Sequence, residues 1–210
     1  FVRGIADAGS VRRLSPLPET SGELLAMANA LGEGREAVFV GPDATEANVK
    51  KHQLKGIEVI AFATHGLLAG ELSGLEEPGL VLTPPKEGSR DNDGILTASE
   101  IAQLKLNAEW VVLSACNTAV GDDYNPGGLP TLSNAFFFAG ARSLLSSYWP
   151  VWSHATAELM KNIFEEKSRN PNIGKAESVR RGMMTLLQQS DPRYSHPRYW
   201  APFMVIGDGS

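Results

Sequence analysis

Two stretches decide the fold of this chain: IEVIAFATHG at Ile57–Gly66 and WVVLSAC at Trp110–Cys116. Both are short apolar runs with several β-branched residues, which is typical of a strand buried in a parallel sheet. In open α/β sheets the chemistry lies at the carboxyl edge of the strands. The first run leads into His65 and the second into Cys116, so we expect these two side chains to share one edge of a sheet.

Cys116 is the single cysteine of the chain. A thiol is a useful nucleophile at neutral pH only when a base lies near it or when its pKa is lowered. Histidine is the side chain best suited to act as that base at this pH. The pair of His65 and Cys116 therefore indicates a cysteine hydrolase.

The composition limits the class of protein. The chain has 210 residues, of which 42% are hydrophobic and 20% charged, so it can bury the core of one α/β domain spanning residues 1–210. Its net charge of -5, without a lysine or arginine block, argues against a nucleic acid or an anionic membrane as partner. A single cysteine, with neither a signal peptide nor an apolar run of about 18 residues, favours a cytoplasmic location. Because the sequence starts at Phe1 rather than Met, we expect a fragment of a longer protein or a processed product.

The hydrophobic pattern predicts alternating helices and strands. Two patterns, Thr20–Glu23 and Thr97–Glu100, are expected capping boxes at the beginnings of helices. Residues 119–130 are rich in Gly and Pro, which indicates a surface loop after the cysteine. The other expected elements are helices at 24–31, 45–54, 131–139, 153–167 and 173–188, strands at 37–40, 143–148 and 203–206, and an apolar run at 79–82.

Other kinds of site find little support. One cysteine and four scattered histidines offer no ligand set for a metal, and there is neither a phosphate-binding loop nor a dinucleotide fingerprint, so we expect no cofactor. Ser114 lacks the flanking glycines of a nucleophile elbow, which argues against a serine hydrolase. We interpret the remaining histidines, His52, His154 and His196, as structural.

Five short motifs follow one another along the chain: FATHG at 62–66, VLSACNT at 112–118, FAGARS at 138–143, WPV at 149–151 and HPRYW at 196–200. On these motifs the chain resembles CHAT domains, the caspase-like domains often found downstream of tetratricopeptide repeats. The resemblance spans nearly the whole chain. The separation of about 50 residues between His65 and Cys116 is also that of caspases.

The resemblance implies a caspase-like three-layer sandwich, with a mostly parallel central sheet and helices on both faces. For active members it also implies cleavage of peptide bonds, with Cys116 as nucleophile and His65 as general acid and base. The backbone N–H groups of Gly66 and Cys116 are the implied oxyanion donors. We therefore expect a cysteine endopeptidase.

The resemblance also suggests where a substrate binds. In caspase-like folds an extended substrate adds as a β-strand beside the segment that here holds Ser147, Tyr148 and Trp149. Relatives of the separase type cut after basic residues and need an acidic group in the first pocket. The candidates for that group, each of which is also interpretable as an ordinary loop charge, are Glu71, Asp122 and Asp123. Trp152-Ser153 stand where the family commonly has an acidic pair, which leaves the basic preference open.

A second class of function stays open beside catalysis. The same fold can act as a catalytically silent adaptor that binds a peptide without cutting it. In either class the expected partners are a protein or peptide and an upstream repeat domain or regulatory protein, with no nucleic acid and no membrane.

Overall fold

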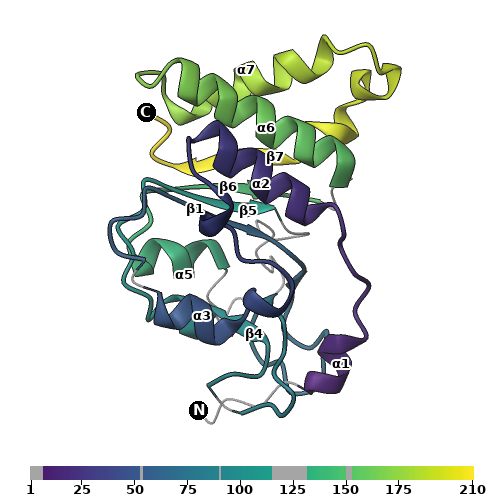
Figure 1. Cartoon of the computed structure of the whole chain (residues 1–210), viewed down its shortest axis with the longest axis vertical. Coiled ribbons are helices and arrows are strands. Elements are labelled where there is room, and N and C mark those ends of the chain that lie inside the picture. Colours follow the sequence, from purple (N-terminus) through teal and green to yellow (C-terminus); the bar gives the residue numbers. More distant parts are fainter. Residues whose placement is uncertain (1–6, 53, 90, 115–131, 150–152) are drawn as a thin grey trace, which may run out of the picture.

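A central four-stranded sheet organises the molecule (Figure 1). The computed structural model describes residues 7–52, 54–89, 91–114, 132–149 and 153–210. The strand order is β1-β5-β6-β7, with β1, β5 and β6 parallel and β7 antiparallel. The strands are β1 (Val59–Ala63), β5 (Trp110–Ser114), β6 (Ser143–Ser147) and β7 (Phe203–Gly207). The expectation of a mostly parallel sheet is confirmed.

The register of the sheet aligns the carboxyl ends of its central strands. Ala63, the last residue of β1, lies opposite Ser114, the last residue of β5. Leu113 of β5 in turn lies opposite Ser146 near the end of β6. The segments that follow these three strands therefore leave the sheet at one edge.

Three helices cover one face of the sheet: α2 (Thr20–Ala30), α6 (Ser153–Arg169) and α7 (Lys175–Leu187) (Figure 1). Helices α2 and α6 pack against each other, and α7 packs against α6 and β7. Strand side chains alternate between the two faces, and on this face the ring of Trp110 lies 5.1 Å from that of Phe164. Burial of this aromatic and aliphatic layer is a main source of stability.

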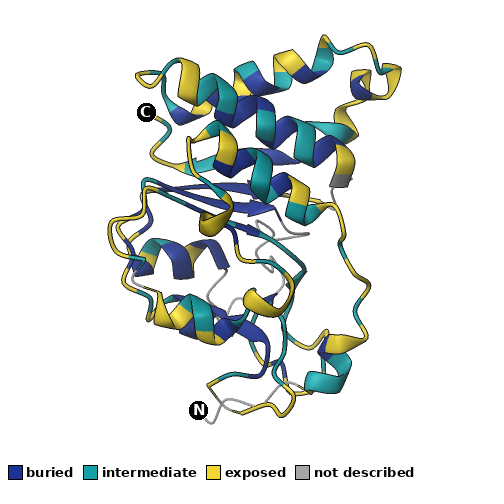
Figure 2. Ribbon diagram, viewed as in Figure 1, coloured by how far each residue is buried: buried dark blue, intermediate teal, exposed yellow. Residues whose placement is uncertain are grey.

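The other face is covered by shorter helices, α3 (Glu46–Lys51), α4 (Ala98–Ile101) and α5 (Leu132–Ala139). Between these layers, the ring centres of Phe62 in β1 and Phe136 in α5 lie 5.6 Å apart. Buried residues fill both spaces between sheet and helices, whereas the outer helix surfaces are exposed (Figure 2). The molecule is therefore the expected three-layer sandwich.

A second, antiparallel sheet continues the chain after β1. It has the order β2-β3-β4, with β2 at Gly66–Leu67, β3 at Gly79–Val81 and β4 at Ile95–Thr97. The short helix α1 (Ala8–Arg12) packs against it through Val11, which shares a small core with side chains of β3 and β4. Two 3₁₀ turns, η3 (Pro192–Ser195) and η4 (Pro197–Tyr199), precede β7.

The predicted strand at 37–40 is wrong. The structure has 3₁₀ turns on either side of it, η1 (Arg35–Ala37) and η2 (Gly41–Asp43). Val38 and Val40 do have extended backbones, but within the described residues they join neither sheet. Apolar β-branched residues favour extended backbone, whereas a strand also needs a hydrogen-bonded neighbour, which local sequence does not reveal.

The two expected capping boxes have different outcomes. Thr97 and Glu100 form one, and the Glu100 carboxylate accepts the Thr97 backbone N–H at 3.0 Å. The box expected at Thr20–Glu23 is wrong: α2 begins at Thr20, whose hydroxyl donates to the Leu17 carbonyl oxygen at 2.7 Å. The Glu23 side chain is instead buried against the sheet, because tertiary contacts override the local pattern.

An ion cluster joins the helices on the second face. Lys50 Nζ lies 2.6 Å from Glu46 Oε1 and 2.7 Å from Glu100 Oε1. Glu46 is fully buried, and its other carboxylate oxygen accepts the backbone N–H groups of Asp93 and Gly94. The cluster therefore fixes α3 to α4 and to the segment that precedes β4.

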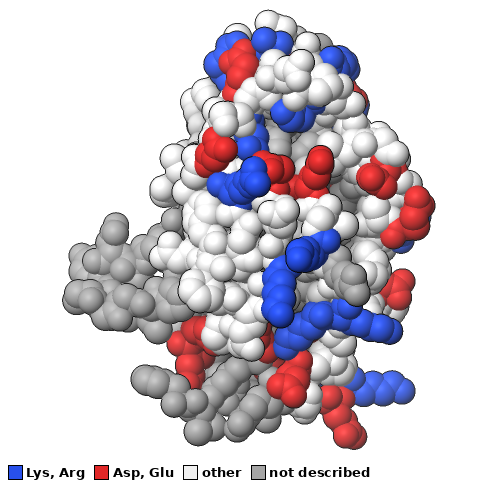
Figure 3. Space-filling model, turned by 90° about the vertical axis from the view of Figure 1, so that its left-hand side faces the viewer, with Lys and Arg blue, Asp and Glu red and all other residues white. Residues whose placement is uncertain are grey.

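The amino edge of the central sheet carries charges of both signs. Arg142, just before β6, pairs with Glu109, just before β5, at 2.9 Å. On the side of the molecule seen in Figure 3, basic and acidic side chains lie among uncharged ones and in places touch one another. Interspersed charge of this kind is typical of a solvated face.

Candidate active site

His65 lies two residues beyond the end of β1 and is held by the second sheet. Its backbone carbonyl accepts the N–H of Val81 at 2.9 Å. The neighbouring Thr64 hydroxyl donates to the Val81 carbonyl oxygen. The imidazole is partly exposed. The structure thus places His65 at the carboxyl edge of the sheet, where hydrogen bonds to Val81 of β3 hold it and its neighbour Thr64.

The orientation of the His65 ring is set by the segment between α1 and α2, which runs along the right-hand side of the molecule in Figure 1. Ring atom Nε2 lies 2.8 Å from the carbonyl oxygen of Ser15. A carbonyl oxygen can only accept a hydrogen bond, so Nε2 must carry the hydrogen. In a neutral imidazole the free lone pair is then on Nδ1, and His65 can accept a proton there.

Gly66 begins β2 directly after His65 and pairs with Leu80 of β3. Glycine at this position leaves the backbone open to close approach, since it has no Cβ. The sequence analysis expects its backbone N–H to act as an oxyanion donor, and the structure places Gly66 directly after the histidine.

The nucleophile candidate Cys116 and the two loop carboxylates, Asp122 and Asp123, lie outside the residues that the structure describes. The described chain reaches Ser114, which is buried and lies opposite Ala63. Ser114 precedes Cys116 by two residues, just as Ala63 precedes His65. The parallel register therefore ends β1 and β5 at the same edge, two residues before His65 and Cys116 in the sequence.

Glu23, a residue that the sequence analysis assigned to a cap, is buried at this edge. It lies in the first turn of α2, with 2% of its surface exposed. Its carboxylate accepts a hydrogen bond from the Ser114 hydroxyl. The second carboxylate oxygen, Oε1, has no hydrogen-bond partner among the described residues. Burial raises the pKa of Glu23 to about 7, and the hydrogen bond from Ser114 acts in the opposite direction.

A signal for this residue was present in the sequence. Residues four apart on a helix share one face, and Glu23 stands four residues before Met27, which is buried in the core under α2. A carboxylate on the apolar stripe of a helix requires either a partner or a function.

The candidate substrate wall follows β6. Ser147 ends that strand, is fully buried and lies opposite Phe203 of β7. Tyr148 and Trp149 come next, with 43% and 42% of their surfaces exposed. Large aromatic side chains that remain this exposed at a strand end are suited to contact a ligand.

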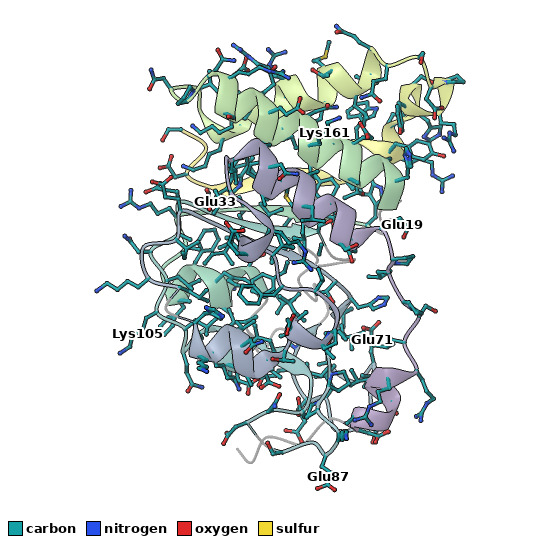
Figure 4. All side chains as sticks on the ribbon, viewed as in Figure 1. Glu19, Glu33, Glu71, Glu87, Lys105 and Lys161 are labelled. Atoms are coloured by element: carbon teal, nitrogen blue, oxygen red, sulfur yellow. The ribbon has the colours of Figure 1, made fainter. Side chains whose placement is uncertain are left out.

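Of the three acidic candidates for the first pocket, Glu71 lies in the described part of the chain. It follows β2, and its side chain is exposed (Figure 4). Its carboxylate accepts the backbone N–H of Leu68 at 2.7 Å. This contact gives Glu71 a local role in shaping the turn. Glu19, at the start of α2, is likewise exposed, in contrast to Glu23 on the same helix.

The other histidines have local contacts. His154 Nδ1 lies 3.0 Å from the Tyr194 hydroxyl, and His196 Nδ1 accepts the backbone N–H of Arg198 at 3.1 Å. The His52 ring packs 4.6 Å from that of Phe39. Within the described parts of the chain, no three His, Asp or Glu side chains gather in a group that could hold a metal ion. None of the helices in those parts is both long and apolar enough to span a bilayer.

Comparison with known sequences identifies the family of the domain. The sequence pattern of the CHAT domain matches residues 6–208. Tetratricopeptide repeat protein 28 from Mus musculus is 29% identical over 226 aligned residues, and the Homo sapiens protein is 28% identical. These alignments cover 91% of this chain but 9% and 8% of the relatives, so the chain spans less than a tenth of their length.

Solved structures support the same fold. The Arg-specific cysteine proteinase gingipain R matches with a TM-score of 0.59 at 15% identity, over 90% of this chain and 41% of that protein. A complex of the RgpB pro- and mature domains from Porphyromonas gingivalis matches with a TM-score of 0.55 at 14% identity, over 87% of this chain and 41% of that one. At these identities the likeness shows the caspase-like architecture alone.

Proposed function

This chain belongs to the CHAT domain family, and we propose that it is a cysteine endopeptidase that hydrolyses peptide bonds in protein substrates. The contact between His65 Nε2 and the Ser15 carbonyl carries the proposal. It leaves Nδ1 of the neutral ring as a proton acceptor at the edge to which β1 and β5 both lead. Cys116 is the proposed nucleophile and His65 its base.

The reaction proceeds in two halves. His65 takes the thiol proton, and the Cys116 sulfur attacks the carbonyl carbon of the scissile bond. The imidazolium then gives its proton to the leaving amine as the C–N bond breaks, which leaves an acyl group on the sulfur. In the second half His65 takes a proton from water, the resulting hydroxide attacks the thioester, and the acid product leaves as Cys116 regains its proton from the imidazolium.

Two backbone N–H groups are proposed to stabilise the oxyanion in both halves, those of Gly66 and Cys116. Donors of this kind act most strongly where water is excluded, and the loss of one typically costs about 100-fold or more in rate. The missing Cβ of Gly66 favours the close approach that such a donor needs.

An extended peptide is proposed to bind along the segment after β6. Tyr148 and Trp149 supply exposed aromatic surface there, and Ser147 supplies the end of the strand against which the peptide adds. Because the relatives are named as tetratricopeptide repeat proteins, we place an upstream repeat domain in the role of regulator. A cytoplasmic setting is part of the proposal, because the single cysteine favours a reducing compartment.

Thiol alkylation tests the dyad without requiring a known substrate. Since Cys116 is the single cysteine, the labelling rate reports on it alone. A thiol that is paired with His65 should label quickly near neutral pH and several-fold more slowly in the His65→Ala variant. His52→Ala, which changes a histidine packed on Phe39, is the matched control and should label like the wild type.

Mass-spectrometric mapping of a diverse peptide library then tests cleavage. Cuts that require both Cys116 and His65 would establish the endopeptidase. Peptides retained by the Cys116→Ala variant, with none cut by the wild type, would instead favour the second candidate, a silent peptide-binding adaptor. The relatives are named for their repeats and not for an enzymatic activity, which keeps that candidate in view.

A further inference from the structure

The feature that the proposed mechanism leaves unused is the buried carboxyl group of Glu23. Its side chain lies in the first turn of α2, is 2% exposed and accepts a hydrogen bond from the Ser114 hydroxyl. The other carboxyl oxygen, Oε1, has no hydrogen-bond partner among the described residues. Such an oxygen is costly to bury, because it has lost its hydration without gaining a donor.

Stability alone does not account for a glutamate at this position. Burial raises the pKa of Glu23, and no described lysine or arginine lowers it. By contrast, buried Glu46 has Lys50 and two backbone N–H groups as partners. Replacing both members of a buried polar pair by apolar groups of similar shape is often neutral or even stabilising. The half-satisfied carboxyl group of Glu23 is therefore expected to serve the site rather than the fold.

The hydrogen bond joins α2 to the end of β5. Side chains alternate along a strand, and Trp110 and Val112, four and two residues before Ser114, pack in the core under α2 and α6. The Ser114 side chain therefore faces the same helices. Helix α2 also packs on β1, whose last residue, Ala63, lies opposite Ser114. Glu23 thus ties the helix to the place where β1 and β5 end side by side.

Both members of the proposed dyad follow these strand ends closely. Cys116 comes two residues after Ser114, and His65 comes two residues after Ala63. Two residues of extended chain span at most about 7 Å. A shift of the β5 end against β1 therefore moves the start of the segment that carries the cysteine relative to the histidine. The same helix also follows the segment whose Ser15 carbonyl orients the imidazole.

We propose that Glu23 is a positioning residue of the site: through the Ser114 hydroxyl it fixes the end of β5, and with it the placement of Cys116 relative to His65. The proposal rests on the proposed endopeptidase function. Placement matters because a displacement of about 1 Å between reacting groups can cost about 100-fold in rate. A hydrogen bond is directional, so it holds the strand end in one place, whereas an apolar contact of the same size lets it slide.

The test separates the hydrogen bond from the charge and from the fold. Glu23→Gln keeps an oxygen that accepts from Ser114 and removes the charge, so kcat should stay near that of the wild type. The double variant Glu23→Leu, Ser114→Ala replaces the pair by apolar groups, and its urea midpoint at pH 8 should equal or exceed that of the wild type. Its kcat on a cleaved peptide should nevertheless fall about tenfold, with KM nearly unchanged. A merely structural role would not lower the rate of a variant whose stability is intact.

Ser143→Ala is the matched control. Ser143 is also a buried strand serine, and its hydroxyl donates to the Glu109 carbonyl oxygen at 2.6 Å, but it begins β6 at the opposite edge of the sheet. Its loss should leave kcat unchanged. Ser114→Ala alone removes the donor with a smaller change and replaces the double variant should that variant not fold.

Alkylation of Cys116 by iodoacetamide separates this proposal from the proposed function, because it needs no substrate. If the wild type cleaves nothing, labelling about tenfold slower in the double variant, with Glu23→Gln and Ser143→Ala like the wild type, would uphold the positioning role and reject the endopeptidase. Wild-type kcat and labelling in the folded double variant would overturn the role of Glu23. A Glu23→Gln variant as slow as the double variant would overturn it as well.

Discussion

The Nε2 atom of His65 lies 2.8 Å from the carbonyl oxygen of Ser15, a residue 50 positions earlier in the chain. Pro16 follows Ser15 directly, and a residue before proline is restricted to extended backbone. The proline therefore helps to hold the carbonyl in place for the imidazole.

Pro16→Gly should weaken catalysis without changing any catalytic side chain. A freer Ser15 backbone orients the His65 ring less often, so kcat should fall by up to about tenfold while KM changes little. Steady-state kinetics on a cleaved peptide measure both. Pro171→Gly loosens an exposed turn between α6 and α7 and should leave kcat near that of the wild type. Equal kinetics for both variants would contradict the orienting role.

The Glu23 carboxyl should make stability depend on pH. Its pKa is raised from 4.5 to about 7 in the folded protein, so between these values the folded state binds more protons than the unfolded state. The stabilising effect of its protonation is complete below pH 4.5 and is lost as pH rises through about 7.

Glu23→Gln should abolish that dependence. Relative to the variant, the wild type should lose up to about 3 kcal/mol of unfolding free energy between pH 4.5 and pH 8, as the shift in pKa implies. Urea unfolding of the two proteins at several pH values measures the difference. Parallel stability curves would show that the carboxyl group is solvated in the folded protein.

Lys50→Met should destabilise the fold more than Lys51→Met, which changes an exposed lysine next to it in the sequence. The first change leaves buried Glu46 and nearly buried Glu100 without their shared cation, at a cost of about 2–4 kcal/mol. The second change removes a solvated charge and should fall within about 0.5 kcal/mol of the wild type. The denaturant midpoints of the two variants measure the difference in stability. Similar losses for both variants would mean that the ion cluster contributes little to the stability of the fold.

Replacing either of two helical glycines by alanine should change the stability of the protein, in opposite directions. A Cβ at Gly182 in α7 would lie 2.9 Å from the backbone nitrogen of Ile163 in α6, so Gly182→Ala should push the helices apart and cost about 1–3 kcal/mol. A Cβ at Gly22 in α2 meets nothing within 4 Å, so Gly22→Ala should stabilise the protein by up to about 1 kcal/mol. Thermal unfolding measures both shifts, and a stable Gly182→Ala variant would show that the contact relaxes easily.

The sequence predicted the strands of the central sheet well, because a strand buried on both faces leaves a continuous apolar run such as that of β5. The positions of His65 and Gly66 at the strand edge were predictable for the same reason. The strand expected at 37–40 failed because its apolar residues have no ladder partner among the described residues, and pairing is a non-local property.

The least predictable part of the site was the pair of Glu23 and Ser114. In the sequence, Glu23 completes a hydroxyl-x-x-Glu pattern, which suggests a local hydrogen bond within a capping box as the reason that a glutamate stands there. Its real neighbour is 91 positions away, across the contact between α2 and the sheet. The role of the Ser15 carbonyl could not be predicted for a similar reason. Every residue has a carbonyl, and only the path of the chain shows which one lies next to the imidazole.

The chain path also couples the two sheets to the chemistry. Helix α1 is anchored on the small antiparallel sheet and α2 on the central one, and the segment that carries the Ser15 carbonyl is stretched between them. A displacement of one sheet against the other would therefore move the Ser15 carbonyl relative to the imidazole that it orients. A protein that binds α1 would therefore act on the orientation of the His65 ring without contacting the ring itself.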